Sequence, residues 1–148
     1  MDPSPMLICY DGSDGARRAI DTAGVLFPTR RAVVLDVGPP VTTEQAFASA
    51  ITLFPAMPEL NEEDALARAA QGADYARAAG LVAEARGTVD TPTWHGILEL
   101  ADEIDAAVII VGSNGVSRAR EVLERSVSHD VSTHSQRPVL VVPPPRGG

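Results

Sequence analysis

Residues 6–23 read MLICYDGSDGARRAIDTA, in which a short apolar run, a glycine-containing turn and a helical pattern follow one another directly. The apolar run at 6–10 is typical of a strand that is covered on both faces. Ser13 is a suitable N-cap for the helix that follows. Apolar side chains then recur at helical spacing at Ala16, Ala19, Ile20, Ala23, Leu26 and Phe27. The segment therefore predicts a buried strand that leads into an amphipathic helix.

The same alternation of short apolar runs and helical patterns continues along the chain. Four further runs are predicted strands, at residues 32–37, 81–85, 106–111 and 138–142. Three further helices are predicted. One starts at Asn61 and ends near Gly80, a typical C′ residue. Another starts at Thr91 with Pro92 at N1, and its apolar face carries Ile97, Leu100, Ala101 and Ile104. The last starts at Ser126, places Val127 and Val131 inward, and has His134 near its end.

This succession of elements predicts an α/β fold. Because crossovers between parallel strands are almost always right-handed, it is most economically a doubly wound, Rossmann-like, five-stranded parallel sheet. We expect strand order 3-2-1-4-5 with helices on both faces. The 148 residues are 45% hydrophobic, enough for one self-sufficient core, so residues 1–148 are predicted to form a single domain.

Two segments fall outside the regular pattern. Residues 38–60 form a long insertion, within which Thr42 and Gln45 have capping-box spacing and Phe47, Ile51 and Phe54 share one helical face. The insertion is interpreted as a satellite helix over the sheet, a flap over a ligand cleft or a partner surface. The proline-rich residues 143–148 are expected to form an extended, frayed tail.

Charge and composition exclude several functional classes. All twelve basic residues are arginines, so chemistry that needs a lysine amine, including the Walker A loop and the pyridoxal Schiff base, is excluded. The net charge of −8 argues against nucleic acid as the partner. Cys9 is the only cysteine and has no internal disulfide partner, and no apolar run is long enough to span a membrane. A cytoplasmic protein is expected.

Two glycine-containing loops are expected to meet at one edge of the sheet. Ligands of doubly wound sheets bind beyond the carboxyl ends of the strands where strand order reverses, here between the first and fourth strands. Residues 11–15 (DGSDG) follow the first strand, and residues 112–115 (GSNG) follow the fourth. Such loops bring backbone N–H groups close to a phosphate, but they also form ordinary strand-to-helix turns. From the residues alone both interpretations stay open.

The C-terminal third carries a longer motif. Residues 112–142, GSNGVSRAREVLERSVSHDVSTHSQRPVLVV, resemble the C-terminal signature of the universal stress protein family, and residues 6–23 resemble its opening strand and helix. The resemblance covers essentially the whole chain. In nucleotide-binding members the signature is G-x2-G-x9-G-[ST]. Gly112, Gly115 and Ser126 match this signature, whereas Arg125 occupies the position of its third glycine.

The resemblance implies further contacts to an adenine nucleotide. Asp11 and the backbone of Val37 would hold the nucleoside end, and Val127 and Ser128 would add amide or hydroxyl contacts to the phosphates. The expected ligand is ATP, with Asp11 holding the ligand or a bridging Mg²⁺.

Arg125 leaves two functions open. An arginine opposes the positive φ and bare backbone that a glycine offers a phosphate, yet its guanidinium can bind phosphate in a bidentate manner. The protein is therefore either an adenine-nucleotide-binding module in stress-response signalling or a family member that binds no nucleotide and acts through protein interactions. With no positioned general base, it is not expected to be an efficient enzyme, although slow incidental hydrolysis fits this interpretation.

The remaining motifs predict structural roles and assembly. His95, His129 and His134 lack the spacing of a helical metal site and are expected at the surface or at helix ends. Trp94 is expected to pack at the end of the sheet. The aliphatic last strand, 138–142, is predicted to lie at a sheet edge. Proteins that the chain resembles pair this strand in a two-fold homodimer, which covers such an edge.

Overall fold

The computed structural model describes residues 3–38, 58–90, 92–113 and 127–146. The helix expected within the insertion, and Gly115, Arg125 and Ser126 of the motif, lie outside these residues.

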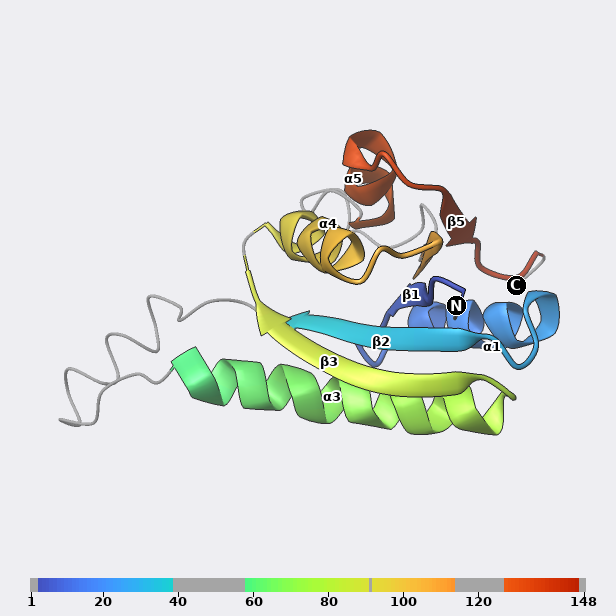
Figure 1. Cartoon of the computed structure of the whole chain (residues 1–148), viewed down its shortest axis with the longest axis horizontal. Coiled ribbons are helices and arrows are strands. Elements are labelled where there is room, and N and C mark those ends of the chain that lie inside the picture. The colour runs from blue at the N-terminus through green and yellow to red at the C-terminus, as the bar shows by residue number, and fades with distance from the viewer. Residues whose placement is uncertain (1–2, 39–57, 91, 114–126, 147–148) are drawn as a thin grey trace, which may run out of the picture.

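A parallel sheet forms the centre of the structure (Figure 1). Its strands are β1 (Met6–Cys9), β2 (Arg31–Gly38), β3 (Val82–Val89), β4 (Val108–Gly112) and β5 (Val139–Val142). Their spatial order is β3-β2-β1-β4-β5, which confirms the predicted order. The helices are α1 (Asp14–Leu26), α3 (Pro58–Ala78), α4 (Thr93–Glu103) and α5 (Val127–His134). None of the described helices has the length and hydropathy needed to cross a lipid bilayer.

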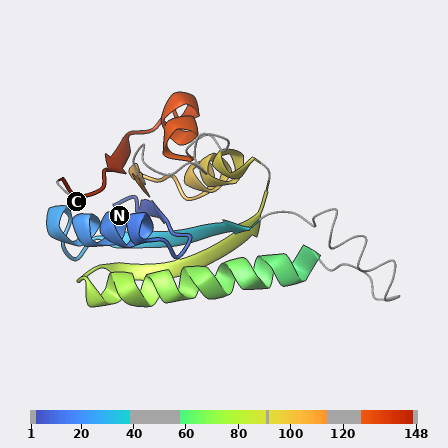
Figure 2. The same cartoon turned by 180° about the vertical axis from the view of Figure 1, so that it is seen from behind.

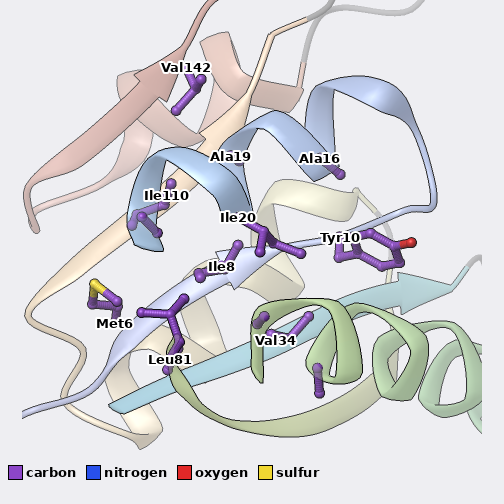
Figure 3. Packing of buried hydrophobic residues seen from close by; sticks show 14 residues of the cluster. Met6, Ile8, Tyr10, Ala16, Ala19, Ile20, Val34, Leu81, Ile110 and Val142 are labelled. Atoms are coloured by element: carbon purple, nitrogen blue, oxygen red, sulfur yellow. The ribbon is translucent and has the colours of Figure 1, made fainter. Parts of the chain in front are cut away.

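Two apolar layers cover the faces of this sheet. Alternate strand residues point to opposite faces, so Ile8 packs with α1 and α3, whereas Leu7 packs with α4 and α5. Figure 3 shows the first layer, in which Ile20 of α1 and Val34 of β2 meet Ile8. Seen from behind in Figure 2, α3 runs along β3 for most of its length. The buried strands read as continuous aliphatic runs because both of their faces are covered.

The first helix begins as the sequence predicts. The Ser13 side chain accepts a hydrogen bond of 3.2 Å from the Ala16 N–H, which satisfies one of the unpaired donors of the first turn. Ala16, Ala19, Ile20 and Ala23 are buried. Leu26 is 53% exposed, so its predicted inward position is wrong. It lies at the margin of the apolar stripe, where helical rotation has carried it away from the sheet.

The long helix α3 ends in a Schellman motif. The Gly80 N–H donates to the Arg77 carbonyl at 3.0 Å, and the Leu81 N–H donates to the Ala76 carbonyl at 3.0 Å. Gly80 has a φ of +96°, which only glycine adopts without strain, so its predicted C′ role is confirmed. The helix starts at Pro58 rather than at Asn61, because a proline fits a first turn whose N–H groups are unpaired.

The third strand is longer than predicted and reaches Val89 instead of residue 85. Beyond residue 85 the apolar pattern is lost, but pairing with β2 continues through Gly87↔Asp36 to Val89↔Gly38. A Cβ at residue 87 would lie 2.3 Å from the backbone nitrogen of Leu66 in α3. The glycine therefore allows the helix to cross the strand closely and does not end the strand.

Two other expectations are corrected at helix starts. Pro92 is the N-cap of α4, in extended conformation with φ −70° and ψ 161°, and not its first helical residue. Val127 in α5 is 40% exposed and does not point inward, whereas Val131 is fully buried. Ser128 and Val131, three residues apart, form the buried face of α5, and Val127 lies beside this face.

Candidate functional site

The carboxyl ends of β1, β2 and β4 lie side by side at one edge of the sheet. Beyond Cys9, the Tyr10 N–H still donates to the Leu35 carbonyl of β2 at 2.9 Å. The Ser113 N–H, just after β4, donates to the Val142 carbonyl of β5 at 2.9 Å. Strand order reverses between β1 and β4, so this edge is the switch point at which doubly wound sheets bind ligands.

The loop after β1 is a tight turn built around Asp11. The Ser13 N–H donates to Asp11 Oδ1 at 2.9 Å, and Gly12 between them has a φ of +84°. This Asx-type turn positions Ser13 as the N-cap of α1. Asp11 is exposed, so its carboxylate borders the same solvent-facing edge as the α1 N-terminus. The structure thus places this predicted site residue at the carboxyl end of β1.

Gly112, at the end of β4, lies directly against the start of α1. A Cβ at this position would come within 2.1 Å of the Gly15 carbonyl oxygen and 3.1 Å of the Ala16 nitrogen. The Arg18 guanidinium of α1 also donates to the Ser113 carbonyl at 3.4 Å. Gly112 and Ser113, the described part of the second predicted loop, therefore meet the start of α1 at the switch point, as the sequence predicts.

The other predicted site residues are distributed around this edge. Val37 lies near the end of β2, is half-buried and packs against the layer formed with α4. Val127 and Ser128 form the first turn of α5, where Ser128 is buried. The α5 helix packs on α4 over the same face as Val37. Helix N-termini carry backbone N–H groups that anions bind, which fits the role that the family resemblance implies.

A buried ion pair next to this edge was missed from the sequence. Asp36 of β2 is only 5% exposed and pairs with Arg68 of α3. Burial raises the pKa of Asp36 above its ordinary value, although the Arg68 guanidinium acts in the opposite direction. Asp36 interrupts an otherwise aliphatic strand, and this interruption could have indicated from the sequence that a buried carboxylate needs a basic partner. Burial, reinforced by the charges of Asp11 and Asp36, also raises the pKa of the Cys9 thiol to about 12, so this thiol is protonated at neutral pH.

A second polar cluster lies where β3 leads into α4. His95 Nδ1 lies 2.8 Å from Asp90 Oδ2 and 3.9 Å from Glu99 Oε2. Asp90 raises the pKa of His95 by hydrogen bonding and by its charge. The sequence interpretation gave His95 a surface or capping role and did not identify these carboxylates as its partners. Asp90 precedes the helix and joins His95 only through the fold.

The predicted roles of His134 and Trp94 are confirmed. His134 is in the last turn of α5, with Nδ1 2.8 Å from the Asp130 carbonyl oxygen, to which it donates. Its ring stacks on Trp94 of α4, with centroids 3.9 Å apart and planes within 8° of parallel. Trp94 also packs against the apolar layer and therefore links α4, α5 and the sheet.

Among the described residues, a depression of about 350 Å³ lies at the opposite edge of the sheet. It is lined by the N-terminal segment and by the amino-end residues Arg31 and Glu84. None of the predicted site residues lines it.

The fold, with Gly112 packed on the start of α1 where strand order reverses, defines a class of small doubly wound α/β proteins. The sequence comparison identifies the family within this class. The universal stress protein family model matches residues 4–143, and the chain belongs to this family. "Universal stress protein YxiE" from Bacillus subtilis is 33% identical to it over 144 residues, which cover 93% of this chain and 97% of that protein.

Solved structures show the same fold. The protein described as hypothetical protein MJ0577 superimposes with a TM-score of 0.72 at 20% identity, covering 97% of this chain and 98% of the other. A universal stress protein in complex with cAMP superimposes with a TM-score of 0.66 at 27% identity, covering 96% and 98% of the two chains.

Proposed function

We propose that the protein is an adenine-nucleotide-binding module of stress-response signalling that takes ATP at the carboxyl edge of the sheet. The observation that carries this proposal is the backbone contact between Gly112 and Gly15. It brings the end of β4 against the start of α1 without an intervening side chain. Phosphate sites of doubly wound folds need this kind of bare backbone next to a helix N-terminus.

The roles of the individual residues follow the family motif. Asp11 and the backbone of Val37 hold the nucleoside end at the ends of β1 and β2. The backbone amides of Gly112 and Gly115 cradle the phosphates, which Ser126 also contacts. The exposed carboxylate of Asp11 suits a hydroxyl group of the nucleoside or a Mg²⁺ ion that accompanies the triphosphate.

The α5 helix supplies the remaining contacts. Its first turn begins at Val127 and contains Ser128, so the N-terminus of this helix, with its partial positive charge, directly follows Ser126 in the sequence. Arg125 directly precedes this turn in the sequence. We assign to Arg125 a side-chain contact to phosphate in place of the backbone approach that a glycine would give.

One relative supports the choice of an adenine nucleotide. The structural neighbour that is 27% identical to this chain was solved with cAMP bound. A binding module also agrees with the sequence better than an efficient enzyme does. The chain has no lysine to neutralise a transferring phosphoryl group, and Asp11 already accepts a hydrogen bond from Ser13.

The proposal is tested by thermal unfolding with and without millimolar ATP and Mg²⁺. A ligand at about 100 times its Kd adds about 2.7 kcal/mol of stability. At roughly 2–4 °C per kcal/mol, the Tm should rise by about 5–10 °C. Gly115→Val should abolish the rise, because its side chain would occupy the space left for the phosphate.

Arg125→Gly separates the two candidate functions, with Arg146→Gly in the tail as the matched control. If Arg125 contacts phosphate, Arg125→Gly weakens binding and the control leaves it unchanged. The second candidate, a family member without a nucleotide, is favoured by the replacement of the third motif glycine. An absent Tm shift in the unmodified protein, together with a shift in Arg125→Gly, would establish that second function.

We also propose that the chain forms a homodimer through its last strand. β5 is an edge strand that pairs only with β4 within the described sheet. Val141 is 38% exposed, and Val139 and Leu140 are half-buried. An aliphatic edge of this kind is normally covered, and pairing with a second copy of itself covers it.

A further inference from the structure

We propose that Asp90, His95 and Glu99 form a binding site for a divalent transition-metal cation at the corner between β3 and α4. This inference is independent of nucleotide binding. It rests on three donor atoms that the fold gathers from two segments of the chain. His95 Nδ1, one oxygen of Asp90 and one oxygen of Glu99 all lie within 4.8 Å of one another.

The separations of these atoms suit a shared ion. Bonds of about 2.0–2.2 Å to nitrogen and oxygen in a tetrahedral site place neighbouring ligand atoms ~3.3–3.6 Å apart. The two distances from His95 Nδ1, 2.8 Å to Asp90 and 3.9 Å to Glu99, bracket this value. Small side-chain rotations would therefore make the two distances equal around a cation. That cation would replace the proton shared by His95 Nδ1 and Asp90.

The backbone holds the ligands in this arrangement. His95 and Glu99 are four residues apart on α4, so their side chains project from the same face of the helix. Asp90 follows β3, and its N–H donates to the Gly38 carbonyl at 3.2 Å, which fixes it against the end of β2. The site is thus anchored to both the sheet and the helix.

Gly96 makes the contact between these two segments close. A Cβ at this position would lie 3.0 Å from the Asp90 Cβ and 3.1 Å from the Val37 Cγ1. The absence of a side chain brings the first turn of α4 onto Asp90. It also places the cluster beside Val37, at the nucleoside end of the proposed nucleotide site. Asp11, by contrast, follows β1.

The donor set selects the class of cation. One imidazole nitrogen with two carboxylates suits Zn²⁺, Ni²⁺ or Co²⁺, whereas Mg²⁺ and Ca²⁺ prefer oxygen ligands alone. The two carboxylates also balance the charge of a divalent ion. The side chains of His95 and Glu99 are 49% and 70% exposed, so an ion has access from solvent and keeps positions open for water.

The test is titration of the untagged full chain with Zn²⁺ by calorimetry and with Ni²⁺ by tryptophan fluorescence, both without nucleotide. Trp94 is the only tryptophan, and its ring centroid lies 5.9 Å from that of His95, so bound Ni²⁺ should quench it. We expect one saturable site per chain. His95→Ala and Glu99→Gln should each lower the affinity by about tenfold or more, since loss of even a supporting group typically costs 10–100-fold.

Two control variants make the test specific. Glu103→Gln changes a carboxylate one turn further along α4 that pairs with Arg86, and it should leave Zn²⁺ affinity unchanged. His134→Ala removes the imidazole stacked on Trp94, so it shows whether quenching arises from an ion bound there. The proposal is overturned if no stoichiometric Zn²⁺ binding occurs. It is equally overturned if a folded His95→Ala variant keeps full affinity, or if Glu103→Gln or His134→Ala weakens Zn²⁺ binding as strongly as His95→Ala.

Discussion

Replacing Gly112 with alanine perturbs the closest backbone contact at the switch point. The added Cβ would lie 2.1 Å from the Gly15 oxygen and 2.4 Å from the Gly15 carbonyl carbon. Ordinary van der Waals contact begins at about 3.4 Å, so β4 and α1 must separate by roughly 1.3 Å. Because the opposing atoms belong to the backbone, no side-chain rotation relieves the overlap.

The expected cost follows from this forced separation. Overpacking in a well-packed site typically costs 1–3 kcal/mol. With backbone on both sides we expect the upper end, about 3 kcal/mol. At roughly 2–4 °C per kcal/mol for a domain near this size, the Tm should fall by about 6–12 °C.

The assay is urea and thermal unfolding of Gly112→Ala beside the matched variant Gly38→Ala. Gly38 also ends a strand, but a Cβ there would meet its nearest atoms at 3.2 Å and 3.4 Å, a contact that small adjustments relieve. We expect Gly38→Ala to cost less than about 1 kcal/mol. If both variants unfold at the same urea concentration, or Gly112→Ala keeps the wild-type Tm within about 2 °C, the proposed backbone contact is wrong.

Two further predictions concern the ion pair and the sheet edge. The raised pKa of Asp36 means that this group favours folding most below its ordinary pKa of 3.8 and loses that contribution as pH rises through the raised value. Asp36→Asn should therefore gain stability relative to the wild type as urea unfolding is repeated from pH 3 to 7, and a relative loss would contradict the assigned direction. Val141→Arg should convert a dimer to a monomer in sedimentation at micromolar concentration, whereas Val25→Arg, at a 79% exposed position on α1, should not. A monomeric wild type would refute the β5 interface.

The strand order was predictable from the sequence because local signals agreed with one another. Aliphatic runs alternate with helical patterns, and turn residues such as Ser13 and Gly80 occupy the positions that their backbone requires. Right-handed crossovers then leave few arrangements of five parallel strands. The end of the third strand was predicted less well. The strand continues past residue 85 through Gly87, whose role is close packing against α3, and that role depends on tertiary structure.

Residues of the candidate site were predictable where they belong to a sequence motif or directly follow a predicted strand. The positions of Asp11, Val37 and Gly112 at the ends of β1, β2 and β4 follow from motif and topology together. The Asp36–Arg68 pair and the Asp90–His95 contact join residues from different elements. No spacing rule identifies such pairs, because the distance between their members is set by how α3 and α4 pack on the sheet.

The central position of β1 has a consequence for how the protein is synthesised. One neighbour, β2, follows β1 closely in the chain, but the other, β4, is made only after β2, α3, β3 and α4. Until residues 108–112 leave the ribosome, the edge of Met6, Leu7 and Ile8 that will pair with β4 has no partner. The nascent chain therefore carries an uncovered apolar edge for most of its translation. Asp11 and Gly112 come together only near the end, so a ligand that needs both cannot assist the early steps of folding.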